Sequence, residues 1–423
     1  MSELQPTTPT PPPAPRRPPS HALTDPPAER AREPRLSWFA RRRREALDRA
    51  ARTMHDRLVA QVMRGERPRA TTGTGTALLV LSVVVLGVFA AAVVLLVVPT
   101  FAPKNVWGWL GVALAWVVVV AVAPRPGRVE ARELPPDEFP LTHAFVGEVA
   151  AAVGTSTPHG LGVTTEFTAF VAQPGLRRRP VLVIGLPVWT MLTDDERVAL
   201  LAHELGHLRG RDTALAHLVD LAHGILLRLA TLLTPLPGDS YSDFADYRLG
   251  VGESQATMNA AGAGILRAVS APATGLLLLF ERLAAVDGQR REYLADLRAA
   301  EIAGTAANVR LLLTMENLPG LHTLAGAAVR RREDPFAALE QVRERPAPTG
   351  QQVAAARARA REQDLRWDAS HPRDDLRLAL VEAVAAKRSL PRTAAEAGSD
   401  RELAGLRHEM ARELGHQLTD TYY

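Results

Sequence analysis

Two uncharged apolar runs near the N-terminus constrain what this chain of 423 residues can fold into. The first covers residues 77–98, and a helix of that length extends about 33 Å, enough to cross the hydrocarbon core of a bilayer. The second covers residues 106–123, extends about 27 Å, and begins with Trp107 and Trp109, a residue type enriched at membrane interfaces. A buried hairpin of a soluble protein is the alternative, but two adjacent uncharged runs favour a transmembrane helical hairpin over residues 77–123.

The charges that flank the hairpin predict its orientation. Arginines are dense before residue 70, and Arg125, Arg128 and Arg132 follow the second run, whereas the turn between the runs carries only Lys104. Because cytoplasmic segments of membrane proteins are enriched in Lys and Arg, both ends of the hairpin are expected in the cytoplasm. The rest of the chain would then face the cytoplasm, as part of a multi-pass protein of the plasma membrane.

Two later apolar stretches leave the number of membrane spans open. Residues 214–234 and 262–285 are long enough to cross a bilayer, but both contain charged side chains. Because a charge at mid-span is costly, amphipathic or buried helices fit these stretches better than a third and fourth span. Residues 237–263, rich in Gly, Ser, Asp and Ala, are expected to form a loop or lid.

The N-terminal 70 residues divide into two parts. Residues 1–35 are rich in Pro and show no apolar periodicity, which predicts a disordered tail. Residues 36–70 combine many arginines with interleaved apolar residues, a pattern typical of a basic amphipathic helix near an anionic membrane surface. Nucleic-acid binding is the alternative for such an arginine cluster. The apolar run that follows directly favours membrane lipid as the partner, and no nucleic acid is expected.

A metal-binding motif carries the chemistry of the chain. His203, Glu204 and His207 form an H-E-x-x-H sequence, in which two imidazoles four positions apart share a helix face and can bind one zinc ion. Glu204 would then lie beside the metal, where it can act as a general base toward a water molecule. The chain contains no Cys, so any zinc must be bound by His, Asp or Glu. An amphipathic helix with two incidental histidines is the alternative.

The surroundings of this motif predict a mainly α fold with a small β-sheet. Residues 193–196, T-D-D-E, are typical of a helix N-terminus, and Gly210 is expected to end the same helix. Upstream, residues 141–153 predict a helix, and the β-branched content of residues 160–172 and 180–186 predicts strands. The second strand could pair with an extended substrate by strand addition, or simply pack in the core.

A third metal ligand is expected downstream. A catalytic zinc site needs three protein ligands and an open fourth position. Glu292 and Asp296 lie four positions apart in a predicted helix over residues 288–302, so they share one face. Glu292 suits the third ligand, and Asp296 could orient a ligand histidine through its ring N–H. Without the upstream motif, such a pair would more simply be a solvated salt-bridge face.

These motifs resemble those of the HtpX-like membrane zinc endopeptidases, with the CAAX prenyl proteases as more distant relatives. The resemblance rests on H-E-L-G-H followed five residues later by Asp212, and on R-E-Y-L-A-D at residues 291–296. It covers about residues 141–387. It implies a gluzincin-type zinc peptidase domain after the transmembrane hairpin, with zinc ligands that match His203, His207 and Glu292 and a general base that matches Glu204.

The resemblance extends to an H-P-x-x-x-x-R element formed by His371 and Arg377. Both are expected either at the cleft or in contact with the metal ligands; at the cleft, the arginine could hold a carbonyl or carboxylate of the substrate. An ordinary helix N-terminus with Pro372 in its first turn is the alternative. Residues 388–423 lie beyond the resemblance and are expected to form a helical tail of unknown role.

The sequence therefore predicts a membrane-anchored zinc endopeptidase with polypeptide substrates. Glu204 would take a proton from the attacking water and pass it to the leaving amine. The resemblance implies a role in membrane-protein quality control. One alternative is a catalytically silent membrane adaptor with a structural zinc, which would need a fourth protein ligand such as His371. The other is a prenyl-protein processing peptidase, for which more membrane spans would be expected.

Overall fold

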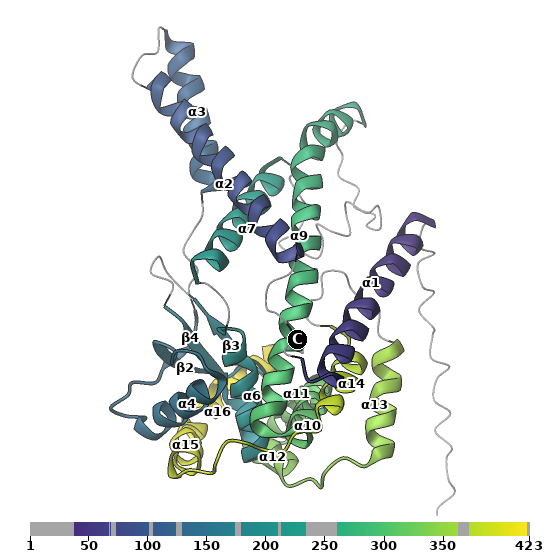
Figure 1. Cartoon of the computed structure of the whole chain (residues 1–423). Helices are drawn as coiled ribbons and strands as arrows, with labels where there is room; N and C mark the ends of the chain where they lie inside the picture. Colours follow the sequence, from purple (N-terminus) through teal and green to yellow (C-terminus); the bar gives the residue numbers. More distant parts are fainter. Residues whose placement is uncertain are drawn as a thin grey trace, which may run out of the picture. The chain divides into compact units, whose positions relative to one another are not determined.

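The computed structural model describes residues 38–66, 68, 73–100, 105–123, 129–173, 179–209, 213–233, 260–362 and 372–420. These parts of the chain are mainly helical with one small four-stranded sheet, which confirms the predicted fold class in outline (Figure 1). The chain divides into two compact units, Met1–Glu45 and Ala46–Tyr423, and the contacts below all lie within the second. The predicted Pro-rich tail and most of the predicted loop at residues 237–263 lie outside the described residues.

The sheet corrects one expectation about substrate binding. Its strand order is β1-β2-β4-β3, with β4 parallel to β2 and antiparallel to β3. The predicted strand at residues 180–186 is confirmed as β4, but β4 has a partner on both sides, so the expectation that it pairs with substrate is wrong. β3 is the edge strand on this side of the sheet. The strands are β1 (Arg132–Glu133), β2 (Gly160–Thr164), β3 (Ala169–Ala172) and β4 (Val181–Gly185).

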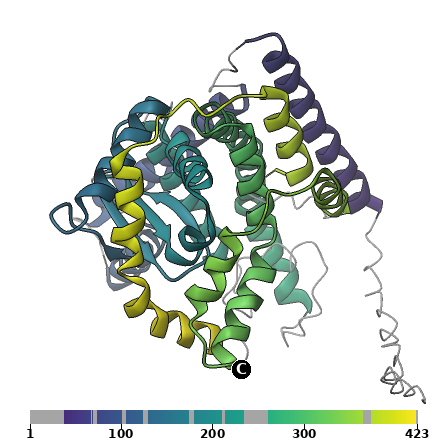
Figure 2. The same ribbon diagram turned by 90° about the horizontal axis from the view of Figure 1, so that it is seen from below.

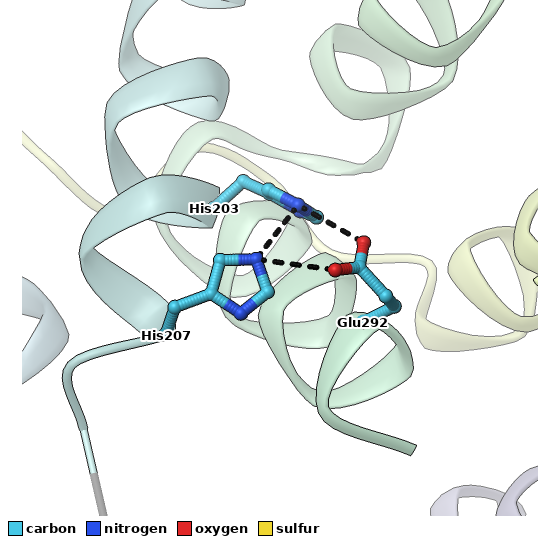
Figure 3. Close-up of side chains that lie close together, drawn as sticks. All are labelled: His203, His207 and Glu292. Atoms are coloured by element: carbon cyan, nitrogen blue, oxygen red, sulfur yellow. Dashed lines mark hydrogen bonds and ion pairs between the residues drawn. The ribbon is translucent and has the colours of Figure 1, made fainter. Parts of the chain in front are cut away.

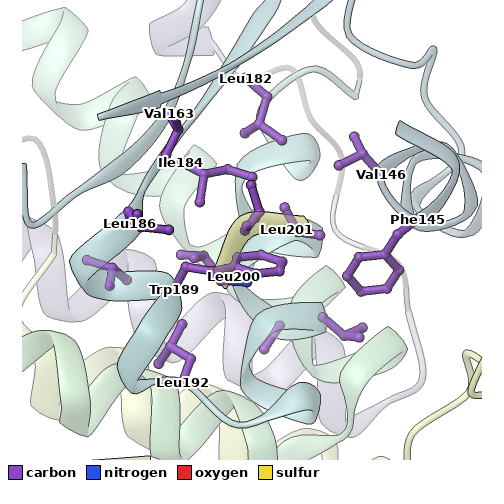
Figure 4. Close-up of a cluster of buried hydrophobic side chains, with 14 of the residues drawn as sticks. Phe145, Val146, Val163, Leu182, Ile184, Leu186, Trp189, Leu192, Leu200 and Leu201 are labelled. Atoms are coloured by element: carbon purple, nitrogen blue, oxygen red, sulfur yellow. The ribbon is translucent and has the colours of Figure 1, made fainter. Parts of the chain in front are cut away.

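Three helices pack with the sheet to form the main hydrophobic core. They are α4 (Pro140–Val153), α5 (Leu186–Met191) and α6 (Asp194–Gly206). Their apolar side chains meet those of the strands in one cluster, because β4 is apolar along its whole length and is almost completely buried. Figure 4 shows this cluster, which includes Ile184 of β4, Trp189 of α5 and Leu201 of α6. The core therefore holds α6, which carries the metal-binding motif, against the sheet.

The C-terminal tail is part of this core. Leu403, Met410 and Leu414 from the two last helices, yellow in Figure 2, are buried in the same cluster as the sheet. Glu402 accepts hydrogen bonds from the backbone N–H groups of Leu141 and Thr142 at the start of α4, at 3.0 and 2.8 Å. The tail predicted at residues 388–423 thus completes the domain. The C-terminal helices are α10 (Thr305–Glu316), α11 (Leu318–Arg330), α12 (Pro335–Arg343), α13 (Gly350–Glu362), α14 (Asp374–Val384), α15 (Ala394–Ala404) and α16 (Arg407–Asp420).

The two apolar runs form helices α2 (Gly73–Thr100) and α3 (Val106–Val122). Among the described residues, α2 alone is both long and apolar enough to cross a membrane, whereas α3 is a shorter apolar helix of 17 residues. The two later apolar stretches belong to α7 (Thr213–Leu233) and to α9 (Ala260–Ala303), and both helices pack against α2 (Figure 1). Many large apolar side chains of α2 and α3 point outward, as expected for helices in contact with lipid.

The basic N-terminal helix α1 (Trp38–Met63) has a protein neighbour on its apolar face. Leu58 is fully buried in a cluster with Tyr293 and Leu297 of α9 and Leu380 of α14. The sequence predicts a position near an anionic membrane surface for this helix, where its apolar face would enter the lipid. In the structure, that face packs on the peptidase core.

Candidate metal centre

The helix that carries the motif begins as its sequence predicts. Glu196 accepts hydrogen bonds from the backbone N–H and the hydroxyl of Thr193, at 2.7 and 2.6 Å, and this confirms the predicted N-terminus of α6. Its other carboxylate oxygen accepts from Nε of Arg310 at 2.9 Å, which ties this end to α10. The helix ends at Gly206, before the predicted end at Gly210, which lies outside the described residues.

A glycine allows the two ligand-bearing helices to approach closely. A Cβ atom at Gly206 would lie only 3.3 Å from Cα and 3.5 Å from Cβ of Ala295 in α9. A side chain at this position would require the neighbouring backbone of α9 to shift by a few tenths of an ångström, so Gly206 suits the close approach of α6 to the helix that carries Glu292. This role depends on the packing of α9 and cannot be inferred from H-E-L-G-H alone.

Three side chains from α6 and α9 converge on one point (Figure 3). Nε2 of His203 lies 3.3 Å from Nε2 of His207 and 3.5 Å from Oε2 of Glu292. Nε2 of His207 lies 3.4 Å from Oε1 of Glu292. The structure thus brings together the three predicted ligands, although 85 residues of chain separate His207 from Glu292. His203 and Glu292 are buried, and His207 is partly exposed.

These separations suit a zinc ion. Zinc binds His nitrogen and carboxylate oxygen at about 2.0–2.2 Å in a tetrahedron, and such ligands lie about 3.3 Å apart. The separation of the two Nε2 atoms and the shortest distance from each ring to Glu292 are within a few tenths of an ångström of that value, although the two rings approach different oxygens of the carboxylate. With one atom from each residue, the three ligand atoms all lie within 4.8 Å of one another. Two imidazoles and one carboxylate are also a donor set used by catalytic zinc sites. The residues present therefore fit zinc, and among the described residues no fourth His, Asp or Glu joins this group, which suits water or substrate in the fourth position.

A buried carboxylate orients the first histidine. Oδ1 of Asp296 lies 3.0 Å from Nδ1 of His203, and because an ionised carboxylate only accepts hydrogen bonds, Nδ1 carries the hydrogen. Burial by itself lowers the pKa of His203, but hydrogen bonds to Asp296 and Glu292 outweigh burial and raise it to about 10. A metal ion therefore has to displace a proton from this ring when it binds. With Nδ1 engaged, Nε2 is the atom directed at Glu292 and His207.

Arg377 keeps that carboxylate ionised. Its Nε and Nη2 atoms each donate to Asp296 at 2.8 Å, and Nη2 lies 3.9 Å from Glu292. Burial raises the pKa of Asp296, but the charge and hydrogen bonds of Arg377 outweigh burial and lower it to about 2. The sequence places this arginine either at the cleft or behind the metal ligands. Arg377 is buried and its guanidinium is directed at Asp296, which corresponds to the second of these positions.

Two predicted site residues remain. Glu204 directly follows His203 and is half-buried, as expected for a group that is shielded yet reachable by a substrate. His371 lies outside the described residues. The structure therefore assembles Glu204 and the three ligands with a pair behind them, Asp296 and Arg377.

Comparison with known proteins adds the family. The sequence model of peptidase family M48 matches residues 138–385, more than half of the chain. The chain belongs to peptidase family M48. This match contains both ligand-bearing helices and confirms the resemblance predicted from the motifs, whereas α15 and α16 lie beyond it.

Two relatives of this M48 chain carry the name Protease HtpX homolog. The protein of Thermococcus sibiricus is 28% identical over 176 residues, which cover 41% of this chain and 56% of the relative. The protein of Persephonella marina is 24% identical over 201 residues, which cover 47% of this chain and 64% of the relative. The chain thus spans less than two thirds of the length of either relative. No solved structure gives a significant match.

Proposed function

We propose that this M48 chain is a membrane-anchored zinc endopeptidase that hydrolyses peptide bonds in polypeptide substrates. One observation carries the proposal: ligand atoms of His203, His207 and Glu292 lie within 4.8 Å of one another, a group that could hold one metal ion, and Glu204 directly follows His203 in the sequence. Membership of family M48 supports the reaction class.

Each residue of the site has a separate role in hydrolysis. When bound, zinc would polarise the scissile carbonyl and make a water molecule more acidic. Glu204 accepts the proton of the attacking water and returns it to the leaving amine. Asp296 holds His203 in the tautomer that directs Nε2 at the metal position, and Arg377 keeps Asp296 ionised.

The edge strand β3 offers a place for the substrate. Among the described residues, β3 pairs with β4 on one side only, and it packs next to α6. An extended peptide can add to such an edge by backbone hydrogen bonds, which bind many sequences because the backbone is common to all. We therefore place the substrate alongside β3, with its scissile bond at Glu204.

The proposal includes the membrane. α2 and α3 would cross the plasma membrane as a hairpin, and the arginines on both flanks would keep the peptidase domain in the cytoplasm. Since α7 and the first part of α9 pack on α2, the metal centre is linked directly to the apolar helices. This link supports substrates among membrane-associated polypeptides and a role in membrane-protein quality control.

The Glu204→Gln variant tests the enzyme assignment. General acid–base catalysis contributes typically 10²–10⁴-fold, so casein hydrolysis by the detergent-purified variant should fall by at least about a hundredfold. Zinc content should stay near one ion per chain, because the ligands are unchanged, whereas Glu292→Ala should lose most of the metal. Glu413→Gln, on the exposed face of α16, serves as a matched control and should change neither quantity.

A different pattern would identify an adaptor. If the parent binds zinc but cleaves nothing, and Glu204→Gln supports the same cellular phenotype, then the protease assignment fails. The metal would in that case be structural.

A further inference from the structure

Helix α1 packs through Leu58 against α9, the helix that carries Glu292, and against α14. Its fully buried residue Leu58 contacts a cluster that contains Tyr293 of α9 and Leu380 of α14. Tyr293 is the residue after the proposed ligand Glu292, and Leu380 lies one helical turn after Arg377. The position of α1 therefore bears on both helices that hold the Glu292 side of the site.

Some buried polar atoms at the contact between α1 and the core lack hydrogen-bond partners among the described residues. The ring centroids of His55 and Tyr293 lie 6.0 Å apart, and the ring planes are tilted by 56°. Nε2 of His55, Oε1 of Gln61 and the hydroxyl of Tyr293 are buried, and none has a hydrogen-bond partner among the described residues. Buried polar atoms without partners oppose docking. Apolar packing has to offset the free energy that these unpaired polar atoms cost. The packed position of α1 can therefore be stabilised further by a ligand that binds its exposed face.

The exposed charged side chains of α1 are mainly basic in the described part of the chain. The helix sequence contains seven arginines against three acidic residues; Arg49, Arg52 and Arg57 are exposed, and so is Asp56. Residues 64–72 alone separate α1 from α2, and nine residues reach at most about 30 Å. If α2 crosses the membrane, these arginines lie within reach of lipid headgroups. Each arginine near an anionic leaflet strengthens binding on the order of fivefold.

We propose that α1 is a brace that anionic lipid holds against the metal centre. Headgroup phosphates bind Arg49, Arg52 and Arg57, while Leu58 presses on Tyr293 and so positions Glu292. The brace touches neither substrate nor metal, so its residues are positioning residues. This inference rests on the proposed peptidase function. Lipid is favoured over nucleic acid as the partner, because the short connection to α2 keeps α1 beside the bilayer.

The first experiment compares two membranes. The full chain is reconstituted in vesicles of phosphatidylcholine alone or of phosphatidylcholine mixed with phosphatidylglycerol, and peptide cleavage is measured. Coupling between two sites typically starts at about fivefold, so kcat should be about fivefold or more higher in the anionic vesicles. KM should change little, because the proposed substrate strand β3 is not part of the brace.

A second readout does not depend on catalysis. The chain has no native Cys, so spin labels at Ala60→Cys in α1 and Ala306→Cys in α10, both exposed positions, report one distance without background. The distribution of this distance should be narrow in anionic vesicles and broad in zwitterionic ones. If the distance responds but no peptide is cleaved, the proposed function fails while the brace stands.

Charge variants show whether the arginines carry the response. The triple variant Arg49→Gln, Arg52→Gln, Arg57→Gln should lose the lipid dependence of both readouts, and the corresponding Lys variant should keep it. A matched control removes three exposed arginines elsewhere, with Arg331→Gln, Arg345→Gln and Arg401→Gln, and should also keep it. Leu58→Ala, a milder change than a buried charge, should broaden the distance in both membranes.

Three results would overturn the brace. One is an equal rate and an equal distance distribution in the two vesicle types. Another is a lipid response that survives in the triple Gln variant. The third is an oligonucleotide that narrows the distance in zwitterionic vesicles as well as anionic lipid does, since this would assign the face to nucleic acid.

Discussion

At the scale of single residues, Asp296 links two side chains that lie far apart in the sequence. It accepts from His203 on α6 and from Arg377 on α14, and it has no exposed surface. Removing its charge would loosen the histidine and also leave a buried guanidinium without its main partner.

We predict that Asp296→Asn lowers zinc affinity about 10–100-fold, the usual effect of losing such a supporting carboxylate. The free energy of unfolding should fall by about 3 kcal/mol or more, because breaking a buried ion pair leaves an uncompensated charge. Competition with a zinc chelator and thermal unfolding measure the two effects. Asp287→Asn, on the same helix, breaks an ion pair with the half-exposed Arg291 and should leave zinc affinity unchanged. Equal zinc affinity in both variants would contradict the role given to Asp296.

The sequence revealed the local part of this centre and missed the part that depends on tertiary structure. His203, Glu204 and His207 are fixed relative to one another by the helical repeat, so their spacing alone indicates their chemistry. Glu292 suits a third ligand and shares a helix face with Asp296, but that spacing alone also fits a solvated salt-bridge face, and no local rule connects Glu292 with a helix that ends 86 residues earlier. The pairing of Arg377 with Asp296 joins residues 81 positions apart, and nothing in either segment distinguishes it from a substrate-binding arginine.

At the scale of elements, α15 secures the start of α6 through charge. Asp400 of α15 accepts from Arg343 at 2.8 Å and lies 2.7 Å from the almost completely buried Arg197 of α6. Burial raises the pKa of Asp400, but the hydrogen bond and charge of Arg197 outweigh burial, so the pKa is lowered overall. A lowered pKa in the folded state means that the charged form stabilises the fold.

The stabilising contribution of Asp400 depends on pH. The contribution of Asp400 is fully present above its unfolded pKa, near 3.8, and is lost as the pH falls through the lower folded pKa. Asp400→Asn should therefore be less stable than the parent at pH 7, and the difference should shrink once the pH drops below about 4. Thermal unfolding with chelator in every sample measures this without a contribution from metal loss. Asp137→Asn, at an exposed position, should follow the parent throughout; a constant difference between parent and Asp400→Asn down to pH 3 would contradict the prediction.

Sequence patterns predicted which segments form strands and helices better than they predicted which elements pack against each other. The β-branched run at residues 180–186 predicts a strand correctly, but strand order depends on long-range pairing, so the edge strand proved to be β3. Likewise, the apolar stripe of α1 has the same spacing whether it faces lipid or protein, and in the structure Leu58 faces protein.

At the scale of the whole molecule, the arrangement in the membrane can be tested with single cysteines. Ser2→Cys and Ser389→Cys should both resist an impermeant thiol reagent in intact cells, because both are expected in the cytoplasm. Lys104→Cys, in the turn between the two apolar runs, should react and serves as the control. Reaction of Ser389→Cys without Ser2→Cys would mean an odd number of spans, and would make one of the helices α7 and α9 a third transmembrane helix.

The single long helix α9 joins the apolar helices to the metal centre. Phe280 is buried against α2 and α7, and the proposed ligand Glu292 follows twelve residues later, about 18 Å along the axis, with the internal Pro272 outside this segment. A tilt of about 3° at Phe280 would displace Glu292 by about 1 Å, several times the 0.2 Å tolerance of zinc–ligand distances. If α2 crosses a bilayer as proposed, the tilt of α9 near Phe280 would follow the tilt of α2, and the thickness of that bilayer would then influence how tightly His203, His207 and Glu292 hold a metal ion.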